Sequence, residues 1–589
     1  MKKGEKAINI VMMFILPIII FYLFEFFLRN PFEKMKFPIQ FLNILFFEIL
    51  FFLLLAIFGK VRTAVRIEAI LAIIVGLVNY FVIQFRSAPV MPWDLFSIST
   101  AASVANNYQY RLNSRAVIVL LLLLMIAIFC QKLKLKITTK LPIRIGCIAV
   151  ALLCLFGYTK YVQREQTVKT YKLYDKLFTP TTMTYRDGTV VAFIMELKYM
   201  HVEKPAGYHA DRALALLNSY DKTDETTGSA PVLENGTLPN IIVIMNEAFS
   251  DLSVLGDYET NMDEIPYMRS LMADAENTIS GYLDVSVLGG NTANTEFEFL
   301  TGDTMAFLPQ GSIPYQQYVR TETDSLASCL KSFGYQTLAM HPYRAKGWDR
   351  DKVYTRFGFD HFYTKNDFEN PQIIREYISD QSDVDKIKEL YEAKEDGTPL
   401  FLFNVTMQNH SSYTEEYDNF IPDIHVTGTD SYALNNYLSL LKKSDESLAD
   451  IISYFDEQEE PTIIVFFGDH QPTNSVVSPI YKLNGKSVSS LSEEELRNRY
   501  KVPFIIHANY DIAEESGLTM SANYLGTKVL KTAGIPLNAY QNYLDSLYPD
   551  YPSVSAMQIT SGDGKVTSVD ERKELLSDYQ VLQYYHLFH

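Results

Sequence analysis

The segment Ile463-Ile464-Val465-Phe466-Phe467-Gly468-Asp469-His470 joins five consecutive apolar residues to an Asp-His pair. A short apolar run bounded by glycine is typical of a strand that is buried on both faces of a sheet. Asp469 and His470 then offer one carboxylate and one imidazole where the strand ends. A lone pair of this type is more often a hydrogen-bonded turn, so its meaning depends on the rest of the chain.

The pattern of short apolar runs recurs after residue 239. Helical patterns separate the runs, at Asp324–Phe333 and Tyr432–Phe455 for example. This alternation predicts an α/β domain with a central mixed sheet and flanking helices, whose ligands bind beyond the carboxyl ends of the strands. The predicted strands are Ile241–Met245, Thr337–Met340, Pro399–Val405, Thr462–Phe467 and Pro503–Ile506.

Two further motifs fall near predicted strand ends. Glu247 directly follows the first strand, and Gly289-Gly290-Asn291-Thr292 leads into a helix-like run. A hydroxyl at a helix start lies near backbone N–H groups, which favour an alkoxide and a bound phosphate. Taken alone, Glu247 is as often a helix-capping or solvated acid as a functional one. A residue such as Thr292 or Asn291, taken alone, is more often a helix N-cap than a catalytic group.

Taken together, the three motifs predict a metal site. Carboxylate, imidazole and hydroxyl ligands suit Mn²⁺, Mg²⁺ or Zn²⁺. The predicted ligands are Glu247, Thr292, Asp469 and His470.

Groups suited to phosphate follow other strands. Arg350 could bind a phosphate through two parallel hydrogen bonds, although a single such arginine is more often a surface charge. His341 and His410 each follow a predicted strand, and Trp348 precedes Arg350 by two residues. Singly, each histidine is more often structural.

The first 160 residues contain five apolar runs that predict membrane spans. Basic residues concentrate at the N-terminus and in the loops after the second and fourth spans, so this side is expected to be cytoplasmic and everything after about residue 160 extracellular. Between spans three and four, Met91–Arg115 is predicted as either an interfacial segment or an ordinary loop. The runs are 8–28, 39–58, 67–85, 116–131 and 143–159.

Charge divides the chain in the same way. Residues 1–160 carry 18 basic and 6 acidic residues, whereas the whole chain has a net charge of −17. The strongly acidic remainder excludes a nucleic-acid binder, which needs a basic face.

Four regions are predicted: transmembrane helices over 1–160, a helical connector and linker over 161–236, a catalytic domain over 237–550, and a C-terminal segment packed on it over 551–589.

These motifs, in this order, resemble the lipoteichoic acid synthase family within the alkaline phosphatase/sulfatase superfamily. The matching elements are Glu247, the G-x-T-x-x-x-E-F element (Gly290, Thr292, Glu296, Phe297), the W-x-R element (Trp348, Arg350), His410 and the G-D-H element (Gly468, Asp469, His470). The resemblance implies a membrane-anchored, sulfatase-like phosphoglycerol transferase with its catalytic domain outside the cell, in a Gram-positive bacterium.

The resemblance also implies the roles of the site residues. Thr292 would be the nucleophile, and Mn²⁺ would be held by Glu247, Thr292, Asp469 and His470. Arg350, His410, His341 and Trp348 would bind glycerol phosphate. The donor would be phosphatidylglycerol, and the acceptor a glycolipid or a lipid-linked polymer.

Alternatives stay open at this point. The chain has no Cys/Ser-x-Pro-x-Arg element, so sulfate-ester hydrolysis is not expected, and Gln471-Pro472 departs from the family pattern. The second hypothesis is transfer of single glycerol phosphate or phosphoethanolamine units to another surface glycan. The third is a non-catalytic protein that binds lipid or polymer. Glu25 and Glu48, inside apolar runs, are assigned no role.

Overall fold

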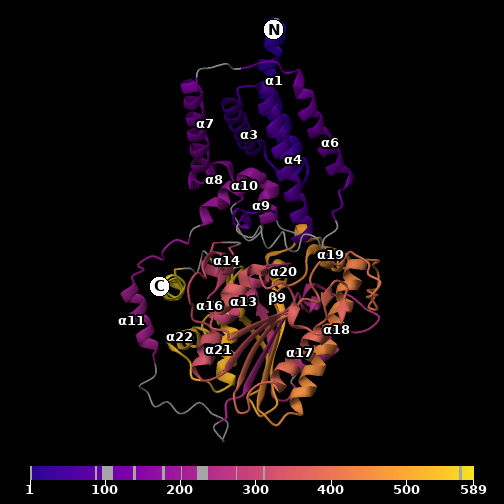
Figure 1. Cartoon of the computed structure of the whole chain (residues 1–589), viewed down its shortest axis with the longest axis vertical. Coiled ribbons are helices and arrows are strands. Elements are labelled where there is room, and N and C mark those ends of the chain that lie inside the picture. The colour runs from indigo at the N-terminus through magenta and orange to yellow at the C-terminus, as the bar shows by residue number, and fades with distance from the viewer. Residues whose placement is uncertain are drawn as a thin grey trace. The chain divides into compact units, whose positions relative to one another are not determined.

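The computed structural model describes residues 3–86, 89–95, 110–136, 141–174, 180–200, 202–221, 237–273, 275–309, 312–569 and 574–589. The chain forms two compact units, one containing Met1–Leu95 and Tyr108–His201 and the other Val202–His589 (Figure 1). Three stretches lie outside the described residues: most of Met91–Arg115, predicted as either an interfacial segment or an ordinary loop, most of the polar linker after Asp221, and residues 570–573 of the C-terminal segment.

The first unit confirms the five predicted spans. Five helices are long and apolar enough to cross a membrane: Gly4–Phe26, Phe37–Phe58, Val61–Phe85, Ser114–Lys132 and Leu141–Val162. The chain is therefore a multi-pass membrane protein. The helices of this unit are α1 (Lys3–Phe26), α2 (Pro31–Lys34), α3 (Phe37–Phe58), α4 (Val61–Arg86), α6 (Ser114–Phe129), α7 (Leu141–Val162), α8 (Glu165–Tyr171), α9 (Pro180–Asp187) and α10 (Thr189–Glu196).

Glu25, to which the sequence assigned no role, is buried at the end of α1. Its carboxylate accepts a hydrogen bond from Arg29 Nη2 at 2.9 Å and one from the backbone N–H of Thr189 at 2.8 Å. The carboxylate therefore ties the start of α10 to the end of the first span.

The second unit is built on an eight-stranded mixed sheet with the order β10-β2-β9-β8-β1-β7-β3-β4. The five strands from β8 to β4 are parallel to one another, whereas β9 is antiparallel to both β8 and β2. The strands are β1 (Asn240–Asn246), β2 (Thr278–Asp284), β3 (Gln336–His341), β4 (His361–Thr364), β7 (Leu400–Val405), β8 (Thr462–Gly468), β9 (Lys501–Ala508) and β10 (Glu515–Ser521). The α/β fold with a mixed central sheet is thus confirmed.

Helices cover both faces of this sheet, α17 and α18 on one side and α13, α16 and α21 on the other (Figure 1). Alternate residues of each strand serve the two faces: Phe466 lies in the core beneath α18, while Phe467 and Phe403 contact Phe299 of α13. Continuous apolar runs follow because both faces are buried. The helices are α12 (Pro266–Met272), α13 (Thr292–Thr301), α14 (Pro314–Gln317), α15 (Leu326–Ser332), α16 (Arg350–Arg356), α17 (Asp380–Glu392), α18 (Tyr432–Asp456), α19 (Asn474–Leu483), α20 (Glu493–Asn498), α21 (Ala522–Thr532) and α22 (Ala539–Leu547).

The C-terminal segment forms a small sheet and a final helix in this unit. Helix α24 (Ser577–Phe588) bonds to the residues that follow α13, because Tyr579 Oη donates to the Gly302 carbonyl at 2.6 Å. Helix α11 (Ala210–Tyr220), from the range predicted as a connector, packs beside α24. The small sheets are β5 (Ile373–Ile374) with β6 (Tyr377–Ile378), and β11 (Ser553–Val554) with β12 (Ile559–Thr560) and β13 (Val566–Thr567).

Candidate active site

Strand register brings the first and third motifs together. β1 and β8 are parallel neighbours in which Asn246 pairs with Gly468, so Glu247 and Asp469 leave adjacent strands at the same level. Gly468 is required by close packing, because a Cβ at this position would lie 1.9 Å from the carbonyl oxygen of Phe249. The sheet thus places both carboxylates at its carboxyl edge.

The side chains of Glu247, Asp469 and His470 converge on one point. One donor atom from each lies within 4.8 Å of the others, and His470 Nε2 is 3.7 Å from Glu247 Oε1 and 3.3 Å from Asp469 Oδ2. Asp469 Oδ2 and His470 Nε2 are buried and have no hydrogen-bond partner among the described residues. Orphaned polar atoms that face one another fit a bound divalent cation.

Surrounding bonds orient these ligands. His470 Nδ1 lies 3.0 Å from the Gln471 carbonyl, which can only accept, so Nδ1 carries the proton and Nε2 presents its lone pair. Asp469 Oδ1 accepts the backbone N–H of Ala248 at 2.7 Å. The two unbonded ligand atoms, Asp469 Oδ2 and His470 Nε2, are therefore already oriented into the site.

Electrostatics also favour a cation here. Burial, and secondarily the nearby Asp469, raises the pKa of Glu247 well above its ordinary value. Burial likewise raises the pKa of Asp469. Two buried carboxylates at this separation disfavour each other's charge, and a divalent cation between them would restore both to the ionised form.

Thr292 joins this cluster from another element. It is the first residue of α13, and the turn before it uses left-handed backbone at Gly289 (φ 64°) and Asn291 (φ 66°). The Asn291 side chain makes no capping bond, whereas Thr292 Oγ1 donates to Glu247 Oε2 at 3.2 Å. Neither Asn291 nor Thr292 therefore caps the helix with its side chain. The Thr292 hydroxyl instead faces Glu247, one of the predicted metal ligands.

Arg350 is buried and already paired. Its Nε donates to both carboxylate oxygens of Glu296, at 3.0 and 3.2 Å, and its Nη2 also bonds Glu296. Tyr354 Oη donates to the same carboxylate at 2.6 Å. The pairing holds the guanidinium near Glu247, where its charge opposes part of the rise that burial causes in the pKa of Glu247, so Arg350 is a fixed positive charge beside the site. Binding of phosphate by Arg350 remains a prediction.

The two predicted histidines are held as neutral imidazoles. His341 is at the end of β3, and its Nδ1 donates to the Val405 carbonyl at 2.8 Å. Burial, with Arg350 nearby, holds the pKa of His341 well below its usual range. Burial lowers the pKa of His410 to about 4, helped by Arg375 and His470. Neutral imidazoles can hydrogen-bond a substrate without adding charge.

Trp348 lies within a short helical turn before α16, half-buried, with φ at 56°. Left-handed backbone is unusual for a bulky residue and costs about 1 kcal/mol or more, which the surrounding fold offsets. The substrate-binding role predicted for Trp348 is still a prediction.

Two residues that support the site were not predicted from the sequence. Thr406 Oγ1 accepts the backbone N–H of Glu247 at 3.1 Å. Arg375 is buried and donates to the carbonyls of Gln408, His410 and Ser412, at 2.7 Å each. Arg375 therefore fixes the loop that carries His410. Thr406 directly follows the predicted strand Pro399–Val405, whereas Arg375 belongs to no apolar run or spaced motif, and neither was predicted as a site residue.

The chain is similar to several known proteins. The sulfatase family model matches residues 239–535. A putative cyclic β-1,2-glucan modification protein of Rhizobium meliloti is 32% identical over 419 residues, which cover 69% of this chain and 63% of that protein. The lipoteichoic acid synthase of Staphylococcus saprophyticus is 25% identical over 43% of this chain and 39% of its own length.

A solved structure has the same fold. The phosphoglycerol transferase GacH of Streptococcus pyogenes, in complex with sn-glycerol-1-phosphate, superposes with a TM-score of 0.52 at 20% identity, covering 65% of this chain and 94% of that one. The curated relatives named above are matched over less than two thirds of their own length.

Proposed function

The chain belongs to the sulfatase family, and we propose that it transfers a glycerol phosphate headgroup from phosphatidylglycerol to an acceptor of the cell envelope. The observation that carries this proposal is the Thr292 hydroxyl, fixed at a helix start against Glu247 and beside Asp469 and His470. Sulfatases place a modified Cys or Ser in a Cys/Ser-x-Pro-x-Arg element, which this chain lacks.

Glu247, Asp469, His470 and Thr292 Oγ1 would hold a divalent cation, with Mn²⁺ proposed. Such an ion, when bound, lowers the pKa of a coordinated hydroxyl and offsets charge on phosphoryl oxygens. The protein's own part is positioning: Glu247 accepts from the Thr292 hydroxyl, and the start of α13 would present backbone N–H groups to a phosphate.

Two displacements complete the proposed reaction. The Thr292 hydroxyl gives up its proton and its Oγ1 bonds to phosphorus, while the bond from phosphorus to the diacylglycerol oxygen breaks and that oxygen takes up the proton. An acceptor hydroxyl then bonds to phosphorus, loses its proton, and releases Thr292 as a hydroxyl again. A covalent intermediate divides one difficult transfer into two easier steps. Arg350, with Glu296 behind it, would place positive charge beside the phosphoryl oxygens.

Two acceptors are proposed. A lipid-linked acceptor, as in lipoteichoic acid synthesis, is supported by the similarity to synthases at 25% identity. A surface glycan that receives single units is supported by the longer match at 32% identity to a putative glucan modification protein, and we favour it for that reason. Basic residues concentrate at the N-terminus and in the loops after the second and fourth spans, which supports a catalytic domain on the opposite, outer face of the membrane. Donor and acceptor would share that surface.

The test uses the full-length protein in mixed micelles with fluorescent phosphatidylglycerol and Mn²⁺. We expect diacylglycerol release by the wild type, at least a 10²-fold loss in Thr292→Ala, and partial activity in Thr292→Ser, which keeps a hydroxyl. Normal release by the alanine variant would refute the nucleophile assignment. Diacylglycerol release from phosphatidylethanolamine but not from phosphatidylglycerol would show that phosphatidylethanolamine is the donor.

The acceptor is then tested by supplying a β-glucan or a glycolipid to the active enzyme. Mass spectrometry of the product distinguishes single added units from a chain. Transfer to neither acceptor, despite diacylglycerol release, would limit the proposal to the donor half of the reaction. No turnover from any phospholipid by a folded, metal-loaded protein would favour the non-catalytic alternative.

A further inference from the structure

Two of the candidate site residues are each directly preceded by a buried asparagine. Asn246 stands before Glu247, and Asn409 stands before His410. The two asparagines are 1% and 0% exposed, and Asn409 Nδ2 donates to Asn246 Oδ1 at 3.0 Å. One side-chain hydrogen bond therefore joins the segment that carries a proposed metal ligand to the segment that carries a proposed substrate-binding residue.

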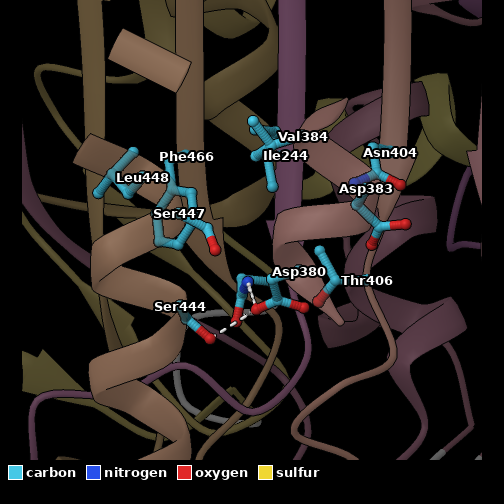
Figure 2. A pocket seen from close by; sticks show the side chains of 11 residues that line it. Ile244, Asp380, Asp383, Val384, Asn404, Thr406, Ser444, Ser447, Leu448 and Phe466 are labelled. Carbon is cyan, nitrogen blue, oxygen red and sulfur yellow. Dashed lines mark hydrogen bonds between the residues drawn. The ribbon is translucent and has the colours of Figure 1, made fainter. Parts of the chain in front are cut away.

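Both asparagines belong to a closed ring of hydrogen bonds beneath the sheet edge. In one arm Asn246 Nδ2 donates to Asp380 Oδ2 at 2.7 Å. In the other arm Asn409 Nδ2 donates to Ser444 Oγ at 2.8 Å, and the Ser444 hydroxyl donates to the same Asp380 oxygen at 2.5 Å. Figure 2 shows the point where the dashed lines reach Asp380. These four residues, the polar ring, thus have one carboxylate oxygen as their common acceptor.

Asp380 sets the direction of the bonds in the polar ring. An ionised carboxylate can only accept, so the hydrogens of Asn246 Nδ2 and Ser444 Oγ both point towards it. Asn246 Oδ1 and Ser444 Oγ then present lone pairs to the two hydrogens of Asn409 Nδ2. Burial raises the pKa of Asp380, and the bonds from Ser444, Asn246 and Thr406 oppose part of that rise. Without this carboxylate two buried donors would lose their acceptor, which is the costly case for a hydrogen bond.

Further bonds tie Asp380 to the same two segments. Thr406, whose hydroxyl acts on the Asp380 carboxylate, also accepts the backbone N–H of Glu247 through its Oγ1 at 3.1 Å. On the other segment, Gln408 Oε1 accepts the backbone N–H of Asp380 at 3.1 Å. Asp380 is therefore bonded to the residues beside Glu247 and to the residues beside His410.

We propose that Asp380 is a positioning residue of the candidate active site, which acts through the polar ring to hold Glu247 and His410 at a fixed separation. The inference rests on the proposed function, since that function assigns Glu247 to the metal and His410 to the substrate. Asp380 itself touches neither. Residues that orient metal ligands in this indirect way typically change metal affinity by roughly 10–100-fold when they are replaced.

α17 and α18 each supply a matched control three positions after their member of the polar ring. Asp383 is 1% exposed, against 2% for Asp380, and both lie in the first turn of α17. Ser447 is buried like Ser444 and donates to a carbonyl of its own helix at 2.9 Å. All four line one small cavity, but in the described part of the chain neither Asp383 nor Ser447 bonds to the polar ring (Figure 2). The same substitution within each pair therefore separates the polar ring from burial, charge and helix position.

The first test is a Mn²⁺ titration of the full-length protein, followed by the electron paramagnetic resonance signal of free Mn²⁺ at a temperature where every variant is folded. We expect the Kd to rise at least tenfold in Asp380→Ala and less than twofold in Asp383→Ala. The milder pair Ser444→Ala and Ser447→Ala should give the same contrast in direction, and it decides the matter if Asp380→Ala does not fold. Equal Kd values within both pairs would overturn the proposal.

Hydrogen exchange of the metal-free protein gives a readout that needs neither metal nor turnover. Peptides that contain residues 246–248 and 408–411 should exchange at least tenfold faster in Asp380→Ala than in Asp383→Ala, while β9 should exchange equally in both. Faster exchange across the whole catalytic unit would mean a merely structural role and would overturn the proposal.

Failure of the transferase proposal stays distinguishable from failure of this one. Wild-type protein that binds Mn²⁺ without turnover would refute the transferase proposal, and the Kd contrast within the two pairs would still decide the role of Asp380. If the wild type bound no Mn²⁺, the exchange contrast would decide it.

Discussion

Glu296 and Glu298 lie two residues apart on α13, both fully buried, yet the same substitution should affect them in opposite ways. Glu296 is bonded through Arg350 Nε at 3.0 and 3.2 Å. Glu298 accepts from Ser286 Oγ at 2.7 Å and from the backbone N–H of Met305 at 2.8 Å, and its other carboxylate oxygen has no partner in the described chain. Only the first acid has a buried counter-charge among these contacts.

Glu296→Gln leaves the Arg350 guanidinium buried without its ion-pair partner. Removing one member of a buried pair costs about 3–5 kcal/mol, which corresponds to a fall in Tm of roughly 5 °C or more. The double variant Glu296→Gln/Arg350→Met should lose less than the sum of the two single changes, because the unpaired charge is gone.

Glu298→Gln should be neutral or stabilising at pH 8. Burial raises the pKa of Glu298 to about 7 from its ordinary 4.5. Between these values the folded protein binds more protons than the unfolded chain, so the free energy of unfolding falls as the pH rises through this window. At about 1.4 kcal/mol per pKa unit the full effect is ~3 kcal/mol, and glutamine should abolish it.

The assay is thermal unfolding of the full-length protein in detergent at pH 5 and pH 8. The reasoning predicts a large loss for Glu296→Gln at both pH values, and for Glu298→Gln a gain relative to wild type that grows from pH 5 to pH 8. Equal Tm values for the two variants at pH 8 would refute the argument, because they would mean that Arg350 contributes nothing through Glu296.

Three further changes follow from the site geometry. Gly468→Ala should destabilise the catalytic unit and lower Mn²⁺ affinity, because the new Cβ would meet the Phe249 carbonyl at 1.9 Å; unchanged metal titration would contradict this. Dialysis against EDTA should abolish turnover and Mn²⁺ should restore it, and activity indifferent to the chelator would remove the metal from the reaction. Arg350→Lys should lower kcat/KM at least tenfold, because an ammonium cannot keep two parallel bonds to Glu296; a near-wild-type rate would exclude Arg350 from the site.

The main features of the fold could be predicted because they are repeated in the pattern of apolar residues. β1, β7 and β8 are buried on both faces, so each is a continuous apolar run. β2 and β10 were not predicted from the sequence. β2 interrupts its apolar residues with Ser280 and Gly281, and the edge strand β10 is largely exposed, so neither shows the same run.

By itself, the sequence determined that the chain has five apolar spans and an acidic α/β domain, and that Glu247, Thr292, Asp469 and His470 stand near strand ends. Those properties are local, because they follow from composition and from the order of residues along each run. Only the tertiary structure decided which buried charge meets which partner. Arg350 reaches Glu296 across 54 residues, and Asp383 meets Asn404 through the packing of α17 on β7. Ion pairing and cavity formation depend on distances between elements, which no local pattern encodes.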